Sequence, residues 1–253
     1  DLRHSEILQV FDYIRLLSSH HTFLMNLKRI LPVFCALLIL SCEKENIEDV
    51  YVPFVYTDSI TYAEGNVYHT VTIGSQVWLA ENLRSTLYNN GDSIEYLYYM
   101  TDWAQTDSGA YCNYSHHPEA ESVYGNMYNF YAVSDPRGIA PPGWHVATYY
   151  EWIGLMAYCG NADAGNRLRE YGYNHWLLDN EEATDQYGFA AIPGCYRDFH
   201  GDFYDMRTSC YFWSSTHWLP SAPGYPEAWY LNIMSDLDPI LALPEHELGN
   251  FPY

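Results

Sequence analysis

Clustered acidic and histidine side chains are the residues of this sequence whose types could do chemistry. His116 and His117 are adjacent and stand close to Glu119 and Glu121, and His145 follows a tryptophan. Strong metal sites use histidines spaced along one helix face or short cysteine pairs, and adjacent histidines do not have that spacing. A histidine immediately before a helix more often makes a structural hydrogen bond, and we interpret His145 in this way.

Acidic residues near the end of the chain are a second candidate, because carboxylate oxygens are the ligands that Ca²⁺ prefers. Asp236 and Asp238 form one group, and Glu245 and Glu247 form another. In so acidic a chain a carboxylate pair for glycoside hydrolysis can always be imagined, and phosphate-loop, dinucleotide and serine-hydrolase motifs are absent. We therefore assign no catalytic residue and no cofactor, and keep Ca²⁺ as an open alternative.

Aromatic and polar residues of the C-terminal third favour a binding surface. Residues 210–216 form a short aromatic run with small hydroxyl residues, followed by a segment of loop composition. Tyr and Trp offer large contact areas at little cost in rotamer entropy, while Asp, Asn and His add directional hydrogen bonds. We expect Trp213 and Trp229 to be buried. The candidate ligand-binding residues are His217, Trp218, Tyr225, Glu227, Asn232, Asp236 and Asp238; packing of Trp218 and Tyr225 on the sheet is the alternative.

The charge balance excludes one class of partner. The 253 residues carry a formal net charge of −21, and only seven Lys or Arg residues follow Cys42. A nucleic-acid partner needs a basic face, so none is expected. Hydrophobic residues make up 48% of the chain and aromatic residues 17%, which is enough for a core and excludes disorder throughout.

The N-terminal part predicts an exported, lipid-anchored protein. Residues 25–41 have a basic start and an apolar run of signal-peptide length, and they end before Cys42 in a sequence that resembles the lipobox of bacterial lipoproteins. We expect lipidation of Cys42, an acidic tether over 42–62, and anchoring to the outer membrane at the cell surface. Residues 1–24 are interpreted as a spurious upstream segment.

Local patterns predict the elements that would position these residues. Residues 64–80 alternate apolar and polar side chains on both sides of Gly74-Ser75, which predicts a β-hairpin. Thr148 and Glu151 fit a capping box, which predicts a helix over 149–158. A shorter helix is expected over 162–170.

The polar stretch between these elements, residues 101–123, lacks a regular pattern. It contains Trp103 and Tyr111 among polar and small residues. We expect a long loop held in place by aromatic anchors.

Eight short motifs follow one another along the chain. They are Gly65-Asn66-Val67-Tyr68, Trp78-Leu79-Ala80-Glu81-Asn82-Leu83, Gly109-Ala110-Tyr111-Cys112, Tyr124-Gly125 with Tyr128-Asn129, Pro142-Gly143-Trp144-His145-Val146, Gly188-Phe189, Pro193-Gly194 with Tyr196-Arg197, and Trp213-Ser214-Ser215-Thr216. In this order they resemble the Fibrobacter succinogenes major paralogous domain. The family is similar in fold to C-type lectin-like domains. This resemblance implies an α+β fold over 63–253, with antiparallel sheets and one or two flanking helices.

The cysteines depart from the family pattern. Ala140 stands where the family usually has a cysteine, and the chain ends before the second one, so we expect a domain truncated before its last strand. Cys195 and Cys210 stand where the family tends to have glycine. We interpret the two cysteines as lying on neighbouring segments and expect a disulfide between them worth about 3 kcal/mol, with two free thiols as the alternative.

The sequence thus predicts a surface-exposed bacterial lipoprotein with a non-enzymatic, lectin-like domain that binds a glycan or a protein. The motifs by which calcium-dependent lectins bind sugars do not occur in it. The alternatives are an extracytoplasmic glycan hydrolase that uses acidic residues on the same face, and a structural component of the envelope or of an appendage.

Overall fold

The structure is a computed structural model. It describes residues 51–242, with the exception of 63, 178, 218–227 and 236–239. The chain divides into two units, Asp1–Val50 and Tyr51–Tyr253, and only the second is described. The predicted signal peptide over 25–41 and the lipidation site Cys42 therefore lie outside the described residues. Within those residues, no helix has the length and apolar character needed to cross a membrane.

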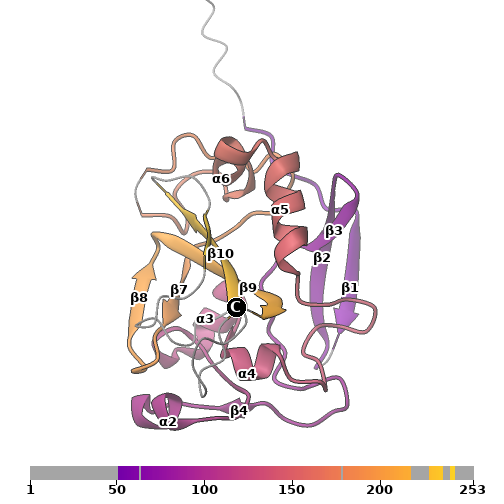
Figure 1. The fold of residues 1–253 in the computed structure, drawn as a ribbon. Coiled ribbons are helices and arrows are strands. Elements are labelled where there is room, and N and C mark those ends of the chain that lie inside the picture. The colour runs from indigo at the N-terminus through magenta and orange to yellow at the C-terminus, as the bar shows by residue number, and fades with distance from the viewer. Residues whose placement is uncertain (1–50, 63, 178, 218–227, 236–239, 243–253) are drawn as a thin grey trace, which may run out of the picture. The chain divides into compact units, whose positions relative to one another are not determined.

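Small, mostly antiparallel sheets and short helices give the described unit an α+β structure (Figure 1). The strands are β1 (Asp58–Tyr62), β2 (Asn66–Ile73), β3 (Gln76–Leu79), β4 (Glu95–Tyr96), β5 (Ala110–Cys112), β6 (Met127–Tyr128), β7 (Gly194–Arg197), β8 (Phe203–Met206), β9 (Ser209–His217), β10 (Ala228–Met234) and β11 (Ile240–Ala242). The helices are α2 (Met100–Gln105), α3 (Pro118–Tyr124), α4 (Phe130–Val133), α5 (Tyr149–Tyr158) and α6 (Ala164–Leu168), with 3-10 turns η1 (Tyr114–His116) and η2 (Asn161–Asp163).

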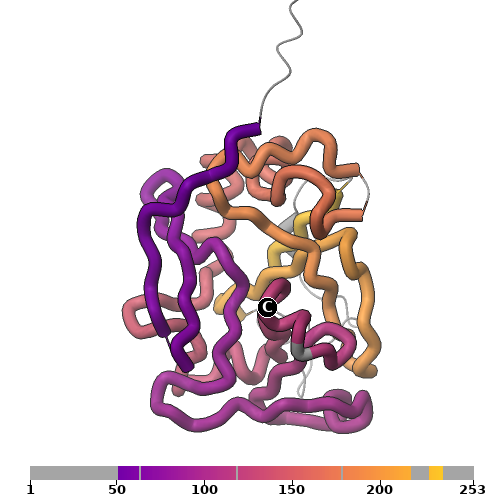
Figure 2. The backbone as a smooth tube through the Cα atoms, turned by 180° about the vertical axis from the view of Figure 1, so that it is seen from behind, coloured from indigo at the N-terminus to yellow at the C-terminus, as the bar shows by residue number. Residues whose placement is uncertain are grey.

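The predicted hairpin is confirmed as β2 and β3, which pair antiparallel across a two-residue turn. Gly74 has a φ of +63° there, a conformation that favours glycine. The structure adds β1, which pairs with the other edge of β2 and makes a sheet in the order β1-β2-β3. These strands lie together at one side of the unit (Figure 2).

The predicted capping box is confirmed at the start of α5. The Thr148 hydroxyl accepts the Glu151 N–H, while the Glu151 carboxylate accepts the Thr148 N–H at 2.7 Å. This exchange satisfies donors that a helix start otherwise leaves unpaired. The second predicted helix is confirmed in a shorter form, as α6, and the 3-10 turn η2 directly precedes it.

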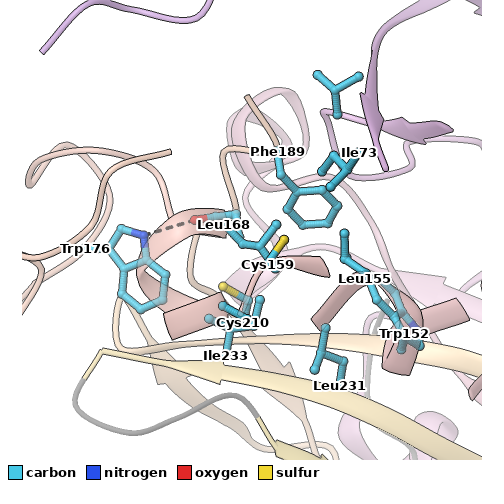
Figure 3. Packing of buried hydrophobic residues seen from close by; sticks show 13 residues of the cluster. Ile73, Trp152, Leu155, Cys159, Leu168, Trp176, Phe189, Cys210, Leu231 and Ile233 are labelled. Carbon is cyan, nitrogen blue, oxygen red and sulfur yellow. Dashed lines mark hydrogen bonds between the residues drawn. The ribbon is translucent and has the colours of Figure 1, made fainter. Parts of the chain in front are cut away.

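Strands β9 and β10 divide two cores, since alternate side chains point to opposite faces of a sheet. Cys210, Leu231 and Ile233 belong to a core that includes Trp152 and Leu155 of α5 (Figure 3). Tyr211, Trp213 and Tyr230 belong to a second core with Phe130 and Tyr128. Trp213 is buried as predicted, but Trp229 is only half-buried, because it lies on the first face near the strand end and packs on Tyr149.

The stretch 101–123 is more regular than predicted, because it contains parts of α2, β5, η1 and α3. Its anchoring by aromatic residues is confirmed: Trp103 is fully buried and donates its indole N–H to the Asp198 carbonyl at 3.0 Å. The buried Arg197 guanidinium lies over the Trp103 ring and donates to the carbonyls of Leu97, Tyr98 and Gly201.

The expected Cys195–Cys210 disulfide is absent from the structure, and both cysteines are free and buried. The reason is the direction of the side chains. Cys210 points from β9 into the core with α5. Cys195 has a φ of +69° and joins a third core with Cys112 and Met127, where its thiol lies 3.8 Å from the Met127 sulfur.

Candidate ligand-binding cavity

A cavity of about 610 Å³ lies beside β3. Three stretches of chain contribute most of its lining: residues 75–83, residues 139–147 without Pro142, and residues 189–192. Trp152 of α5 and Trp213 of β9 also line it. Ligand sites are typically concave, largely apolar and of this size, so the cavity is the candidate functional site of the described residues.

Four aromatic side chains form one continuous wall of this cavity. Trp78 and Trp152 stack with ring centroids 4.6 Å apart, and Phe189 meets Trp78 edge-on at 6.0 Å. Phe212 completes the group, 5.6 Å from Trp152 and 5.9 Å from Phe189. The hairpin, α5, the 189–192 segment and β9 each supply one ring. The wall therefore depends on the tertiary fold and not on any single motif.

A histidine–glutamate pair lines the cavity at the start of α5. The His145 Nε2 atom lies 2.8 and 2.9 Å from the two carboxylate oxygens of Glu151, which also accepts from the Thr148 hydroxyl. Burial alone would raise the pKa of Glu151, but the hydrogen bonds from Thr148 and His145 outweigh it and hold the pKa below its ordinary value. The interpretation of His145 as a structural hydrogen bonder is confirmed.

Glu81, two residues after the end of β3, is the other carboxylate among the described residues that line the cavity. It accepts the backbone N–H of His69 at 2.7 Å and lies 2.6 Å from the His69 ring nitrogen Nδ1. This bond ties the end of β3 back to β2. Both carboxylates of the cavity thus hold backbone elements in place.

Two buried polar atoms of lining residues have no hydrogen-bond partner among the described residues: the indole nitrogen of Trp78 and the side-chain oxygen of Asn126. An unpartnered buried polar group costs about 1–3 kcal/mol. Such groups are uncommon in cores selected for stability alone and are more often accepted at functional sites.

A buried carboxyl group supports the 189–192 segment. Asp185 accepts the backbone N–H of Ala190 at 2.8 Å, and Ala190 has a φ of +49°. Burial raises the pKa of Asp185 to about 7, helped by the charge of Glu170 and opposed by the Ala190 hydrogen bond.

Of the residues predicted to bind a ligand, the two that the structure describes do not line this cavity. His217 ends β9 as an exposed residue 4.9 Å from the Phe130 ring, and Asn232 lies buried in β10. Trp218, Tyr225, Glu227, Asp236 and Asp238 lie outside the described residues. Among the residues that are described, no group of three or more His, Cys, Asp or Glu side chains is placed to hold a metal ion.

The sequence profile of the Fibrobacter succinogenes major domain matches residues 71–224, more than half of the chain. The chain belongs to this family. Comparison with curated proteins and with solved structures gives no match. Several motifs that carry the resemblance to the Fibrobacter succinogenes major domain meet at the cavity, including Trp78 to Leu83, Gly143 to Val146, Phe189 and Trp213. Their convergence is the sequence signal by which the site could have been found.

Proposed function

We propose that this member of the family is a bacterial surface lipoprotein whose domain binds a glycan or a protein without changing it chemically. We place its ligand in the cavity beside β3. The observation that carries this proposal is the aromatic wall of Trp78, Trp152, Phe189 and Phe212 in a cavity of about 610 Å³. Flat apolar rings suit the apolar faces of sugar rings as well as apolar protein side chains.

The environment of the two carboxylates favours binding over hydrolysis. A glycoside hydrolase needs one carboxylic acid that keeps its proton, which requires a raised pKa. In this cavity the hydrogen bonds from Thr148 and His145 lower the pKa of Glu151. The carboxylate of Glu81 already accepts the backbone N–H of His69 and lies within hydrogen-bond distance of the ring nitrogen of the same residue. Neither group has the environment of a general acid.

The attachment to the cell surface and the finer fold assignment rest on sequence patterns. The lipobox-like ending before Cys42 supports a lipid anchor in the outer membrane. Residues 43–49 resemble the short Lys and acidic export signals of Bacteroidetes lipoproteins, which supports display at the cell surface. The α+β architecture, with α5 packed on the sheet of β9 and β10, is compatible with a C-type lectin-like relationship. We propose neither a cofactor nor a nucleic-acid partner.

Filling the cavity tests the proposal. Ala140 lines the cavity, so Ala140→Trp should occupy it, whereas Ala162→Trp adds the same side chain at an exposed position elsewhere. Both variants and the parent would be screened by thermal shift against a glycan library and a peptide library. We expect compounds that stabilise the parent and Ala162→Trp but not Ala140→Trp. Equal stabilisation of all three proteins would place the ligand elsewhere.

A further inference from the structure

The cavity lies along the free edge of a β-strand. All four residues of β3, Gln76–Leu79, line it. In the sheet of order β1-β2-β3, β3 is an edge strand. Successive side chains of a strand point to opposite faces, and residues from both faces of β3 line the cavity, which places the cavity along this edge.

The register of the hairpin shows which backbone groups point toward that edge. The Ala80 N–H donates to the His69 carbonyl at 2.9 Å, which identifies the hydrogen-bonded position of the ladder. Such positions alternate with non-bonded ones in antiparallel pairs. Val77 and Leu79 therefore occupy the non-bonded positions opposite Thr72 and Thr70, and direct their N–H and C=O groups away from β2. Within the described part of the chain, no hydrogen bond reaches these groups.

An exposed strand edge with a pocket beside it is the arrangement by which proteins bind extended peptides. Backbone hydrogen bonds provide affinity, and a pocket that accepts alternate side chains provides specificity. Here the aromatic wall supplies the pocket. A sugar could pair its hydroxyls with single N–H or C=O groups, whereas an extended backbone also matches their two-residue spacing along the strand.

The charge at the cavity narrows the class of peptide. The Glu81 and Glu151 side chains are 32% and 34% exposed, so both carboxylates reach solvent from the lining. The chain as a whole has a formal charge of −21. Opposite charges at the rim of an interface favour encounter and select partners.

Building on the proposed function, we infer that the cavity binds an extended segment of another protein that adds a strand to β3. That segment places a large apolar side chain against the aromatic wall and carries basic residues at its flanks.

Synthetic peptides test this on the full chain held in detergent micelles. The probe is an array of decapeptides of alternating Val and Thr with one central Phe, flanked by Lys, beside the same peptides flanked by Glu. Each Lys-flanked peptide is also made with single N-methyl groups that step along its backbone. We expect Lys-flanked peptides to bind more tightly, and methylation to weaken binding at every second residue by about tenfold for each backbone bond lost.

Val77→Pro removes one outward N–H without removing a bond to β2, and Val77→Thr is its matched control with the donor intact. We expect the affinity for the peptides to fall by about tenfold in Val77→Pro and to be unchanged in Val77→Thr. Three results would overturn the inference: no binding of any peptide, methylation effects without the two-residue period, or full binding by Val77→Pro. If glycans stabilise the parent and not Ala140→Trp while no peptide binds, the cavity stays the ligand site and only the strand addition is wrong.

Discussion

Trp78 of β3 and Trp152 of α5 stack with ring centroids 4.6 Å apart and 28° between their planes. This contact joins the hairpin to the helix within one wall of the cavity. Trp152 is 4% exposed and also donates its indole N–H to the Trp213 carbonyl at 3.2 Å. One side chain therefore links three elements that line the candidate site.

Removing that side chain should destabilise the whole unit. We expect Trp152→Ala to lower the free energy of unfolding by about 3–5 kcal/mol, as is usual when a large buried aromatic ring is removed. Trp152→Phe keeps a ring and should cost less, about 1–3 kcal/mol for the lost indole bond. Urea denaturation measures both. The exposed Tyr150 of the same helix is the control, and Tyr150→Ala should change the value by less than about 0.5 kcal/mol.

Glu151 should make the protein more sensitive to acid. Burial opposes ionisation of its carboxyl group, but the hydrogen bonds from Thr148 and His145 have the larger effect and lower the folded-state pKa. The resulting stabilisation is present above the unfolded pKa and is lost as the pH falls through the lower folded value. The denaturation midpoint would be measured at a series of pH values from neutral to strongly acidic. As the pH falls, this midpoint should therefore decrease less in Glu151→Gln than in the parent. Glu95→Gln, at an exposed position, should keep the parental profile.

The buried carboxyl group of Asp185 should have the opposite effect on the pH dependence of stability: its contribution should be lost as the pH rises. Burial raises its folded-state pKa to about 7 from an ordinary value of 3.8. The folded state therefore holds this proton more tightly, so the contribution is fully present below pH 3.8 and is lost as the pH rises through 7. In Asp185→Asn this loss should be absent, since Asn can still accept the Ala190 N–H. A variant that loses as much stability as the parent between pH 4 and pH 8 would contradict this account.

The four described cysteines should behave as protected thiols. Cys112, Cys159, Cys195 and Cys210 are free and buried, and burial raises the pKa of each. The thiolate is the reactive form, so we expect very slow alkylation of the native protein and complete alkylation in urea without reductant. Peptide mass mapping identifies each site. If Cys195 and Cys210 were alkylated only after reduction, the two cysteines would form the disulfide predicted from the sequence, and the free thiols of the structure would be wrong.

Local sequence signals identified local structure well. The capping box of Thr148 and Glu151 and the turn at Gly74 each depend on neighbouring residues alone, and both are confirmed. Short elements within 101–123 had no such signal: α2 depends on distant contacts of Trp103 with Arg197 and Asp198, and β5 depends on pairing with β4 and β6. The disulfide was wrong because proximity of two strands does not determine which face each cysteine points to.

The cavity was not predicted from sequence for a related reason. Its wall combines one ring from each of four distant segments, and no single motif contains more than one of Trp78, Trp152, Phe189 and Phe212. Sequence reasoning instead selected the loop after β9, whose composition suits binding. Residues 218–227, between β9 and β10, lie outside the described residues, so their role stays a prediction.

The most direct test of the central claim is a nitrogen-15 NMR titration that follows the indole N–H signals of the tryptophans. The titrant is whichever peptide or glycan stabilises the parent protein in the thermal screen. Trp78, Trp144, Trp152 and Trp213 line the cavity, whereas Trp103 and Trp176 are fully buried away from its lining. We predict shifts in the cavity-lining group and unchanged signals for Trp103 and Trp176. Shifts confined to Trp218 and Trp229 would place recognition on the loop after β9 and would contradict the cavity as the ligand site.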